Sequence, residues 1–492
     1  MGIEVFLNPS TTFNPMVMGY DSIGIKRCNF KIYDENDNEV PFDFDPDTET
    51  IRVRFRNVPV GVKTLKMKFF NKLLDTGGIM AKFTGDYTLG FGYYHSLFLT
   101  ETGKVYGVGY STNGQVGYNS TATTANTVWI NYFDNEKVIK VAAGERHSAA
   151  ITESGKLYMW GLNNNGQLGL GDTTQRNIPT LVDPAKFGNE KIVDVGLGGW
   201  STNGHTIALT ETGKVYMWGQ NTEGQLGDGT TTQRNVPTLI PQSAFNNEKV
   251  VGLSLGGNFS GCITETGKVY MWGQNNYGQL GDGTTTDRYV PTLISQSAFN
   301  NEKVVGLSLG RYHSGCITET GKVYMWGLNS SGQLGDGTTT QRNVPTLIPQ
   351  SAFNNEKVVA LSLGRNYSGC ITETGKVYMW GRNDYGQLGD GTTANKFVPT
   401  LIYQNIGDKI IVGLHLGGDH TGAITKEGKL YTWGRNDYYQ LADGTTTNRS
   451  VPTLIPSSKF GNETIQIPVN DITTLKTTKT LTRTELVPIF QQ

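Results

Sequence analysis

The sequence predicts an all-β protein. Most of it forms a seven-bladed β-propeller over residues 86–460, preceded by a small antiparallel β-sandwich at residues 1–80. Three observations predict this fold. First, the tetrad Gly-Gln-Leu-Gly recurs at intervals of 52 to 58 residues, with weaker first and last copies. Second, a Trp-Gly pair precedes most copies. Third, each copy reads as four short strands and lacks helical periodicity. The seven tetrads begin at Gly114, Gly166, Gly224, Gly278, Gly332, Gly386 and Tyr439.

The fifth copy shows how one unit divides into strands, which we call A to D. Strand A is expected at 304–309, from its alternating small and branched residues, and strand B at 314–318. The turn between B and C contains Gly321, which can adopt a positive φ, and strand C follows at 322–326. Strand D is expected at 344–348 on the outermost edge, because its proline cannot donate a hydrogen bond to a further strand.

The first 80 residues do not match the repeat. The segment 51–56 alternates strictly, as a half-buried strand does, and 26–33 and 62–70 read similarly. We expect these segments to form the small sandwich, which would act as an anchoring and assembly domain.

Two other features lie outside the repeats. The acidic spacing of Asp43, Asp45 and Asp47 resembles a calcium loop but lacks the glycine and the final acid of such loops, so no metal is expected. The tail, residues 461–492, is expected to hold a ring-closing strand at 464–469 and an extended C-terminal arm that packs on a neighbour.

Charge and hydropathy narrow the classes of partner. The net charge of −1 gives no basis for binding nucleic acid. No apolar run reaches the length of a membrane span, so no membrane insertion is expected. The N-terminus lacks the basic and apolar regions of a secretory signal, which predicts synthesis in a cytoplasm.

The residue types that often carry chemistry recur here as repeat positions. One position near the start of strand B is His in five copies and Phe259 or Tyr367 in two others, which indicates packing rather than a base or a metal ligand. The aspartates of the glycine-rich loops are expected to form turns. Three cysteines are one strand position copied three times, without metal or disulfide spacing. No catalytic or phosphate-loop signature occurs, so we expect no enzyme activity and no cofactor. These positions are His95, His147, His205, His313 and His420; Asp228, Asp282, Asp336, Asp390 and Asp443; and Cys262, Cys316 and Cys370.

The repeat pattern resembles the regulator of chromosome condensation repeat family. It contains Gly-x-x-His-Ser, Thr-Glu-x-Gly-Lys-Val-Tyr-x-Trp-Gly, Asn-x-x-Gly-Gln-Leu-Gly-x-Gly and Arg-x-x-Pro-Thr-Leu, over about three quarters of the chain. The resemblance implies a seven-bladed propeller. Family members include nucleotide-exchange factors for small GTPases, protein inhibitors of β-lactamases and modules of larger proteins, so the fold does not choose a function. Exchange factors carry a protruding hairpin, whereas the only insertion here is about four residues at 200–203, which argues against exchange activity.

Copies four, five and six are nearly identical, so the positions at which they differ are informative. Strands alternate in direction, which places the A–B and C–D loops on one side of the propeller, the loop face. The B–C turns and D–A segments lie on the other side, the turn face. Nearly all differences fall in the A–B and C–D loops or at the start of strand D, and they introduce residues favoured in recognition surfaces. The alternative explanation is that the turn face has stricter backbone requirements.

We therefore predict a ligand-binding loop face. Its candidate residues are Asn258, Phe259, Gln274, Asn276, Tyr277, Tyr289, Arg311, Tyr312, Leu328, Arg365, Tyr367, Arg382, Asp384, Tyr385, Phe397, Arg435, Asp437 and Tyr438.

Three functions agree with these features. The first is a non-enzymatic adhesin or decoration protein of a phage or phage-like particle. It would bind a host surface protein or glycan through the loop face and other particle proteins through residues 1–80, with oligomerisation possible. The second is a regulatory or inhibitory propeller that binds one protein partner, located in the cytoplasm. The third is a guanine nucleotide exchange factor for a small GTPase.

Overall fold

A computed structural model describes residues 88–467 with their side chains, together with the backbone of six further strands. The chain divides into two compact units, which are described separately. One comprises Met1–Ala81 with Asn470–Gln492, and the other comprises Lys82–Val469.

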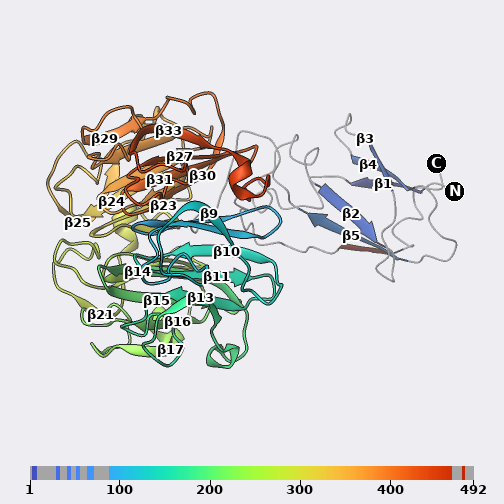
Figure 1. The fold of residues 1–492 in the computed structure, drawn as a ribbon. Coiled ribbons are helices and arrows are strands. Elements are labelled where there is room, and N and C mark those ends of the chain that lie inside the picture. Colours follow the sequence, from blue (N-terminus) through green and yellow to red (C-terminus); the bar gives the residue numbers. More distant parts are fainter. Residues whose placement is uncertain are drawn as a thin grey trace. The chain divides into compact units, whose positions relative to one another are not determined.

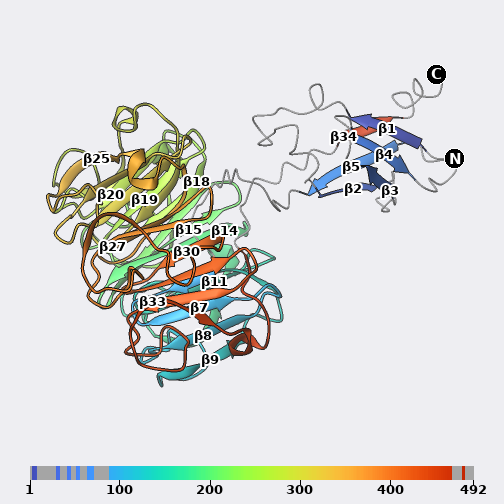
Figure 2. The same cartoon turned by 90° about the horizontal axis from the view of Figure 1, so that it is seen from above.

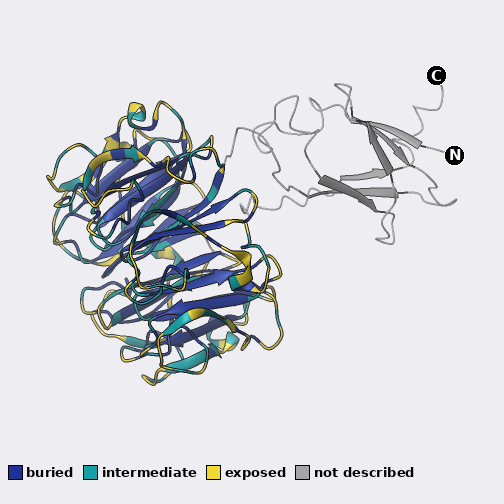
Figure 3. Ribbon diagram, turned by 45° about the horizontal axis from the view of Figure 1, so that its top comes forward, coloured by how far each residue is buried: buried dark blue, intermediate teal, exposed yellow. Residues whose placement is uncertain are grey.

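The larger unit is a seven-bladed propeller, which confirms the predicted fold. Each blade is a four-stranded antiparallel sheet whose strands follow one another in chain order. The last blade lies beside the first, which closes the ring (Figures 1 and 2). The strands are mostly buried, whereas the exposed residues gather in the loops and at the outer strands (Figure 3).

The strand bounds are as follows. Blade one holds β6 (Leu89–Phe91), β7 (His95–Leu99), β8 (Val105–Gly109) and β9 (Thr124–Ile130); blade two holds β10 (Val138–Ala143), β11 (His147–Thr152), β12 (Leu157–Gly161) and β13 (Arg176–Leu181); blade three holds β14 (Ile192–Trp200), β15 (Asn203–Thr210), β16 (Val215–Gly219) and β17 (Arg234–Ile240); blade four holds β18 (Val250–Leu255), β19 (Phe259–Thr264), β20 (Val269–Gly273) and β21 (Arg288–Leu293). Blade five holds β22 (Val304–Leu309), β23 (His313–Thr318), β24 (Val323–Gly327) and β25 (Arg342–Ile348); blade six holds β26 (Val358–Leu363), β27 (Tyr367–Thr372), β28 (Val377–Gly381) and β29 (Lys396–Leu401); blade seven holds β30 (Ile411–Leu416), β31 (His420–Thr425), β32 (Leu430–Gly434) and β33 (Arg449–Ile455).

The repeated tryptophan and tetrad hold neighbouring blades together. In blade five, the Trp326 indole and the Ser314 hydroxyl both donate to the main-chain oxygen of Gln279 in blade four, at 2.9 and 2.7 Å. The last glycine of the tetrad, Gly281, has φ +77°, and a Cβ there would lie 2.7 Å from Trp326 Nε1. Glycine is therefore needed at this position for two reasons, backbone conformation and close approach of the ring.

The junction between blades seven and one supports this explanation. There the tryptophan is replaced by Val108 and the glycine by Ala442, whose φ is 62°. The smaller side chain in blade one leaves room for the Cβ of Ala442. The serine contact is kept, because Ser96 donates to the main-chain oxygen of Gln440 at 2.8 Å.

The repeated histidines also join neighbouring blades, which confirms that they have a packing role. The five are buried, and each ring nitrogen Nε2 meets a hydroxyl of the next blade, as between His313 and Ser368 at 3.0 Å. Burial, followed by the charge of His147, lowers the pKa of His95 to about 3. These rings are therefore neutral at physiological pH and serve as uncharged links around the ring.

The chain closes the ring with its C-terminal segment. Ile465, which is buried, forms an antiparallel bridge with Thr100 of blade one. The amides of Glu101 and Gln466 donate to the carbonyls of Thr464 and Leu99 on opposite sides of this bridge. The inner strand of blade one is thus built from two segments. The C-terminal segment around Ile465 supplies its first part, and β6 supplies the rest.

The turn face is held by one ion pair that recurs in six blades. In blade three, Lys214 Nζ lies 2.5 Å from Glu190 Oε1, and Thr212 donates to the same carboxylate. The other pairs are Lys104–Glu463, Lys156–Glu136, Lys268–Glu248, Lys322–Glu302 and Lys376–Glu356.

Short 3-10 helices constrain the D–A segments in the same way. They are η2 (Pro184–Phe187), η3 (Gln242–Phe245), η4 (Gln296–Phe299), η5 (Gln350–Phe353) and η6 (Ser457–Phe460). Each buries its phenylalanine, and after η3 both Asn246 and Asn247 adopt left-handed backbone angles. The constancy of the turn face thus has structural causes, so a binding role for the loop face must be argued from its own geometry.

The glutamates of these ion pairs give the fold an acid-sensitive component. The hydrogen bond from Lys214, and then those from Thr212 and Thr210, lower the pKa of Glu190 from 4.5 to about 2. A carboxyl whose folded pKa is depressed stabilises the fold above its unfolded pKa, and that contribution is lost as the pH falls from 4.5 to about 2. We expect urea midpoints to fall in this window, and to fall less in Lys214→Met, whose Glu190 has lost its principal partner. An identical pH dependence of the two proteins would contradict this role of the pair.

Six short strands are described in the smaller unit, and they form two antiparallel sheets. One sheet has the order β1 (Ile3–Leu7), β4 (Ile51–Phe55), β3 (Phe42–Asp45), and the other has the order β2 (Asn29–Tyr33), β5 (Thr64–Phe70), β34 (Lys479–Thr482). The tail therefore contributes a strand to this unit, where the sequence had suggested an arm on a neighbour. The predicted packing of a sandwich and the calcium-like spacing at 43–47 depend on side chains outside the described residues.

Candidate functional site

The seven inner strands surround a central cavity of about 260 Å³. Leucines, serines and glycines of these strands form its wall, and the A–B loops form one end. We call that end the cavity mouth. Tyr93, Glu145, Trp200, Arg311 and Arg365 lie there, contributed by five different blades.

The insertion at 200–203 crosses this mouth. It lengthens the β14–β15 hairpin, whose turn is made by Ser201 with φ 62° and Thr202. The Ser201 amide donates to Glu145 of blade two at 2.5 Å, and the Gly199 amide donates to the carbonyl of Gly256 in blade four at 3.2 Å. The hairpin therefore folds down onto neighbouring blades.

Trp200, at the end of β14, is the centre of the mouth. The guanidinium carbons of Arg311 and Arg365 lie 3.0 and 4.5 Å from its ring centroid, and the Tyr93 ring meets it edge-on at 5.8 Å. Blade three thereby reaches side chains of blades five, six and one. Such contacts are cation–π and aromatic interactions, which hold flat side chains in fixed positions.

A buried carboxylate organises the neighbouring arginines. Asp419 in blade seven is 1% exposed, and its oxygens lie 3.8 Å from Arg365, 3.7 Å from Arg382 and 3.5 Å from Arg435. Burial raises the pKa of Asp419, although the three arginines act in the opposite direction. These three guanidiniums share one buried carboxyl group.

Blades six and seven carry the same Arg-Asn-Asp-Tyr sequence after strand C. Arg382 pairs with Asp384 and Arg435 pairs with Asp437, each at 2.6 Å. Arg435 also lies 4.5 Å from the ring centroid of Tyr385.

Tyrosines extend the mouth outward over blades one and seven. The Tyr94 and Tyr438 ring centroids are 4.7 Å apart, and those of Tyr110 and Tyr438 are 4.9 Å apart. On the opposite side, the Tyr277 and Tyr312 rings lie 5.1 Å apart. The loop face therefore presents half-buried aromatic rings on both sides of Trp200.

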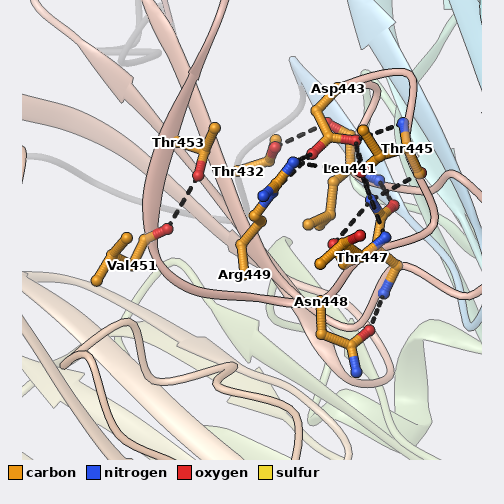
Figure 4. Close-up of polar contacts among 10 residues, drawn as sticks. Thr432, Leu441, Asp443, Thr445, Thr447, Asn448, Arg449, Val451 and Thr453 are labelled. Atoms are coloured by element: carbon orange, nitrogen blue, oxygen red, sulfur yellow. Dashed lines mark hydrogen bonds and ion pairs between the residues drawn. The ribbon is translucent and has the colours of Figure 1, made fainter.

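The C–D loops, which carry Tyr277, Arg435 and Tyr438, are cross-linked by hydrogen bonds and ion pairs. In blade seven, Asp443 accepts hydrogen bonds from Thr445 and pairs with Arg449 at 2.7 Å (Figure 4). The buried Asn436 side-chain amide donates to Asp443 and to the Thr445 carbonyl, at 2.9 Å each. The same arrangement in other blades confirms that the loop aspartates form turns. Among the described residues, no group of acidic, histidine or cysteine side chains could hold a metal.

Sixteen of the eighteen predicted loop-face residues fall into three groups. Ten lie at or around the mouth: Tyr277, Arg311, Tyr312, Arg365, Arg382, Asp384, Tyr385, Arg435, Asp437 and Tyr438. Four others lie in loops of blades four and five and are half-buried or exposed: Asn258, Gln274, Asn276 and Leu328. Tyr289 and Phe397 lie at the start of strand D, exposed by 46% and 43%.

The prediction was wrong for Phe259 and Tyr367, which are fully buried. They begin strand B at the histidine position and pack toward the next blade. The Tyr367 hydroxyl donates to the carbonyl of His420 at 2.6 Å, so this side chain joins blades six and seven and is not part of the surface.

Six residues at or around the mouth were not predicted: Tyr93, Tyr94, Tyr110, Glu145, Trp200 and Asp419. Tyr93, Tyr94, Glu145 and Asp419 lie in A–B loops, at the two positions before the histidine position, whereas Trp200 ends β14 and Tyr110 follows β8. Four of them occupy the two x positions of the repeated Gly-x-x-His pattern. A comparison of these positions in copies one, two and seven, like that made for copies four to six, would have identified them. The insertion containing Trp200 was recognised from the sequence. The sequence did not show that it folds across the mouth, because its contacts are with other blades of the closed ring.

Comparison with known proteins identifies the repeats. The sequence pattern of the RCC1-like domain matches residues 201–480, which is more than half of the chain. The chain belongs to the RCC1-like domain family. The regulator of chromosome condensation (RCC1) repeat pattern also matches residues 102–151 and 154–209.

Relatives of this RCC1-like chain differ in length and role. The human E3 ubiquitin-protein ligase HERC2 is 32% identical over 72% of this chain, which spans 7% of HERC2. The ultraviolet-B receptor UVR8 of Arabidopsis thaliana is 29% identical over 73% of this chain and 79% of the receptor. The structure of Prp20p from Saccharomyces cerevisiae, described with its binding to Gsp1p and histones, has a TM-score of 0.61 at 21% identity, covering 78% of this chain and 90% of that one. The structural likeness shows the shared fold. Within the described residues, no helix has the length and hydropathy to span a bilayer.

Proposed function

We propose that this RCC1-like propeller is a non-enzymatic regulatory protein that binds one protein partner through its cavity mouth. The observation that carries the proposal is the convergence of arginines and aromatic rings from blades one, three, five, six and seven on that face. Arginine, tyrosine and tryptophan dominate the energetic centres of protein interfaces. Those of the C–D loops of blades six and seven stand on loops that the aspartates hold in place, which reduces the entropy lost on binding.

Relatives support a binding role. Prp20p binds Gsp1p and histones according to its structural description, and UVR8 is described as a receptor. Exchange on a GTPase is one specific form of the proposal. The short Trp200 hairpin, which folds onto blades two and four, speaks against a protruding wedge and for simple binding.

The particle adhesin stays a hypothesis. It would use the same loop face, but neither HERC2, UVR8 nor Prp20p supports a host-surface or particle partner. A location in a virion, or alternatively in the cytoplasm, is likewise open to experiment. Its proposed anchor at residues 1–80 has no described side chains. Recovery of the chain in purified particles would favour it over the regulatory role.

Site-specific photo-cross-linking tests the proposal. A photoreactive phenylalanine replaces Tyr312 at the mouth or, as a matched control, the exposed Glu265 on the turn face. In cells that make the protein, we expect one discrete adduct from position 312 and none from 265. Trp200→Ala in the same protein should weaken partner binding about tenfold or more, since it removes the centre of the face. An adduct from position 265 alone, or unchanged binding in Trp200→Ala, would contradict the proposal.

A further inference from the structure

Two arginines from adjacent blades meet on one tryptophan ring. Arg311 belongs to blade five and Arg365 to blade six, and both guanidiniums lie over Trp200. Like charges brought together in this way repel each other, and a partly buried site weakens their screening by water. The pair is therefore favourable only if other groups compensate for its charge.

The chain compensates for this charge incompletely. Arg311 forms no ion pair with any carboxylate of the described residues, and the Nε atoms of both arginines are buried without a hydrogen-bond acceptor. Asp419 lies 3.8 Å from Arg365 but is shared with Arg382 and Arg435.

Glu145, the other nearby acid, also fails to compensate fully for the charge of the two arginines. Burial raises the pKa of Glu145 to about 7, even though the Ser201 amide and the arginines favour its ionised form. Near neutral pH this acid is therefore only partly charged. Burial also lowers the pKa of Arg311, as expected for a cation without a close counter-ion.

We propose that Arg311 and Arg365, held on Trp200, bind the carboxylate of an acidic segment in the protein partner. The inference rests on the function proposed above and names the chemistry of that partner. A carboxylate can accept parallel hydrogen bonds from guanidinium groups, which gives strength and orientation together. Its arrival would bring a counter-ion to Arg311, whose side chain is only partly buried and forms no ion pair with a carboxylate of the described residues.

The surroundings favour a protein segment over a free anion. Tyr93 receives a hydrogen bond from Arg365, and the Tyr312 ring lies 4.5 Å from the Arg311 guanidinium carbon. These rings offer apolar surface to the residues that flank an acidic side chain. A small inorganic anion would leave that surface uncovered.

The test uses the full chain and a defined probe. The probe is a fluorescein-labelled peptide of alternating glutamate and tyrosine, and its control carries glutamine in place of each glutamate. By fluorescence anisotropy we expect the glutamate peptide to bind about tenfold more tightly, because charge-assisted hydrogen bonds exceed neutral ones in strength. The double variant Arg311→Gln/Arg365→Gln should lose this preference. Lys249→Gln/Lys357→Gln, which removes the same charge from the exposed turn face, should keep it.

The outcomes separate this inference from the proposed function. Equal binding of the two peptides, or equal loss of preference in both double variants, would overturn the inference. So would displacement of the peptide by inorganic phosphate from the parent protein, because the site would then accept oxyanions in general. In each case a partner cross-linked at position 312 would still support the proposed function. Thermal unfolding of both double variants verifies that they are folded.

Discussion

Deletion of residues 461–492 should destabilise the propeller by about 3–6 kcal/mol, whereas deletion of 470–492 should leave its stability nearly unchanged. Only the first deletion removes Ile465, which is 2% exposed and bridges to Thr100. It also removes Glu463, the partner of Lys104 on the turn face. The ring would lose a buried side chain, main-chain hydrogen bonds and an ion pair at the junction of its first and last blades.

Chemical denaturation of the two truncated proteins checks this expectation. Ile465→Ala in the full chain isolates the buried side chain and should cost about 2–4 kcal/mol. Equal denaturation midpoints for the two truncations would show that blades one and seven hold together without the C-terminal segment.

The second large effect concerns the contact between tetrad and tryptophan. Gly281→Ala should cost about 2–4 kcal/mol, because it adds both left-handed strain and a clash with Trp326. Gly188→Ala is the matched control: its φ is +66°, but no atom lies within 4 Å of the new Cβ. That variant should lose only about 1 kcal/mol, the cost of the backbone conformation.

A double-mutant cycle separates the clash from the strain. Trp326→Val alone should cost about 3–5 kcal/mol, since it leaves a cavity and removes the hydrogen bond to Gln279. Combined with Gly281→Ala, it recreates the pair Val108 and Ala442 found at the seventh junction. The combined loss should be smaller than the sum of the single losses by about 1 kcal/mol or more. Equal costs for Gly188→Ala and Gly281→Ala, or strict additivity, would refute the packing explanation.

The propeller could be predicted because its information is local and repeated. The predicted strand A of the fifth copy, 304–309, coincides with β22, and the other strands differ by one or two residues at their ends. Each copy carries its own turn and a version of the tetrad, and six of the seven carry the tryptophan, so one misjudged element would be corrected by the other copies. The polarity of the blade also followed from strand direction alone.

The site could be predicted only in part, because it forms between distant copies. Trp200 meets Tyr93 and Arg365 only when the ring closes, and Asp419 gathers arginines from two blades. Comparing copies four to six identified loop positions that vary, but it could not tell a mouth residue from one that begins strand B. Phe259 and Tyr367 were assigned to the surface for that reason.

Hydrogen exchange of the propeller with and without its bound partner tests the central claim most directly, namely that recognition occurs at the cavity mouth. We expect added protection over residues 198–203 and 309–313, which carry Trp200 and Arg311, and no change over the turn at 264–268. Protection of that turn with an unchanged mouth would contradict the claim.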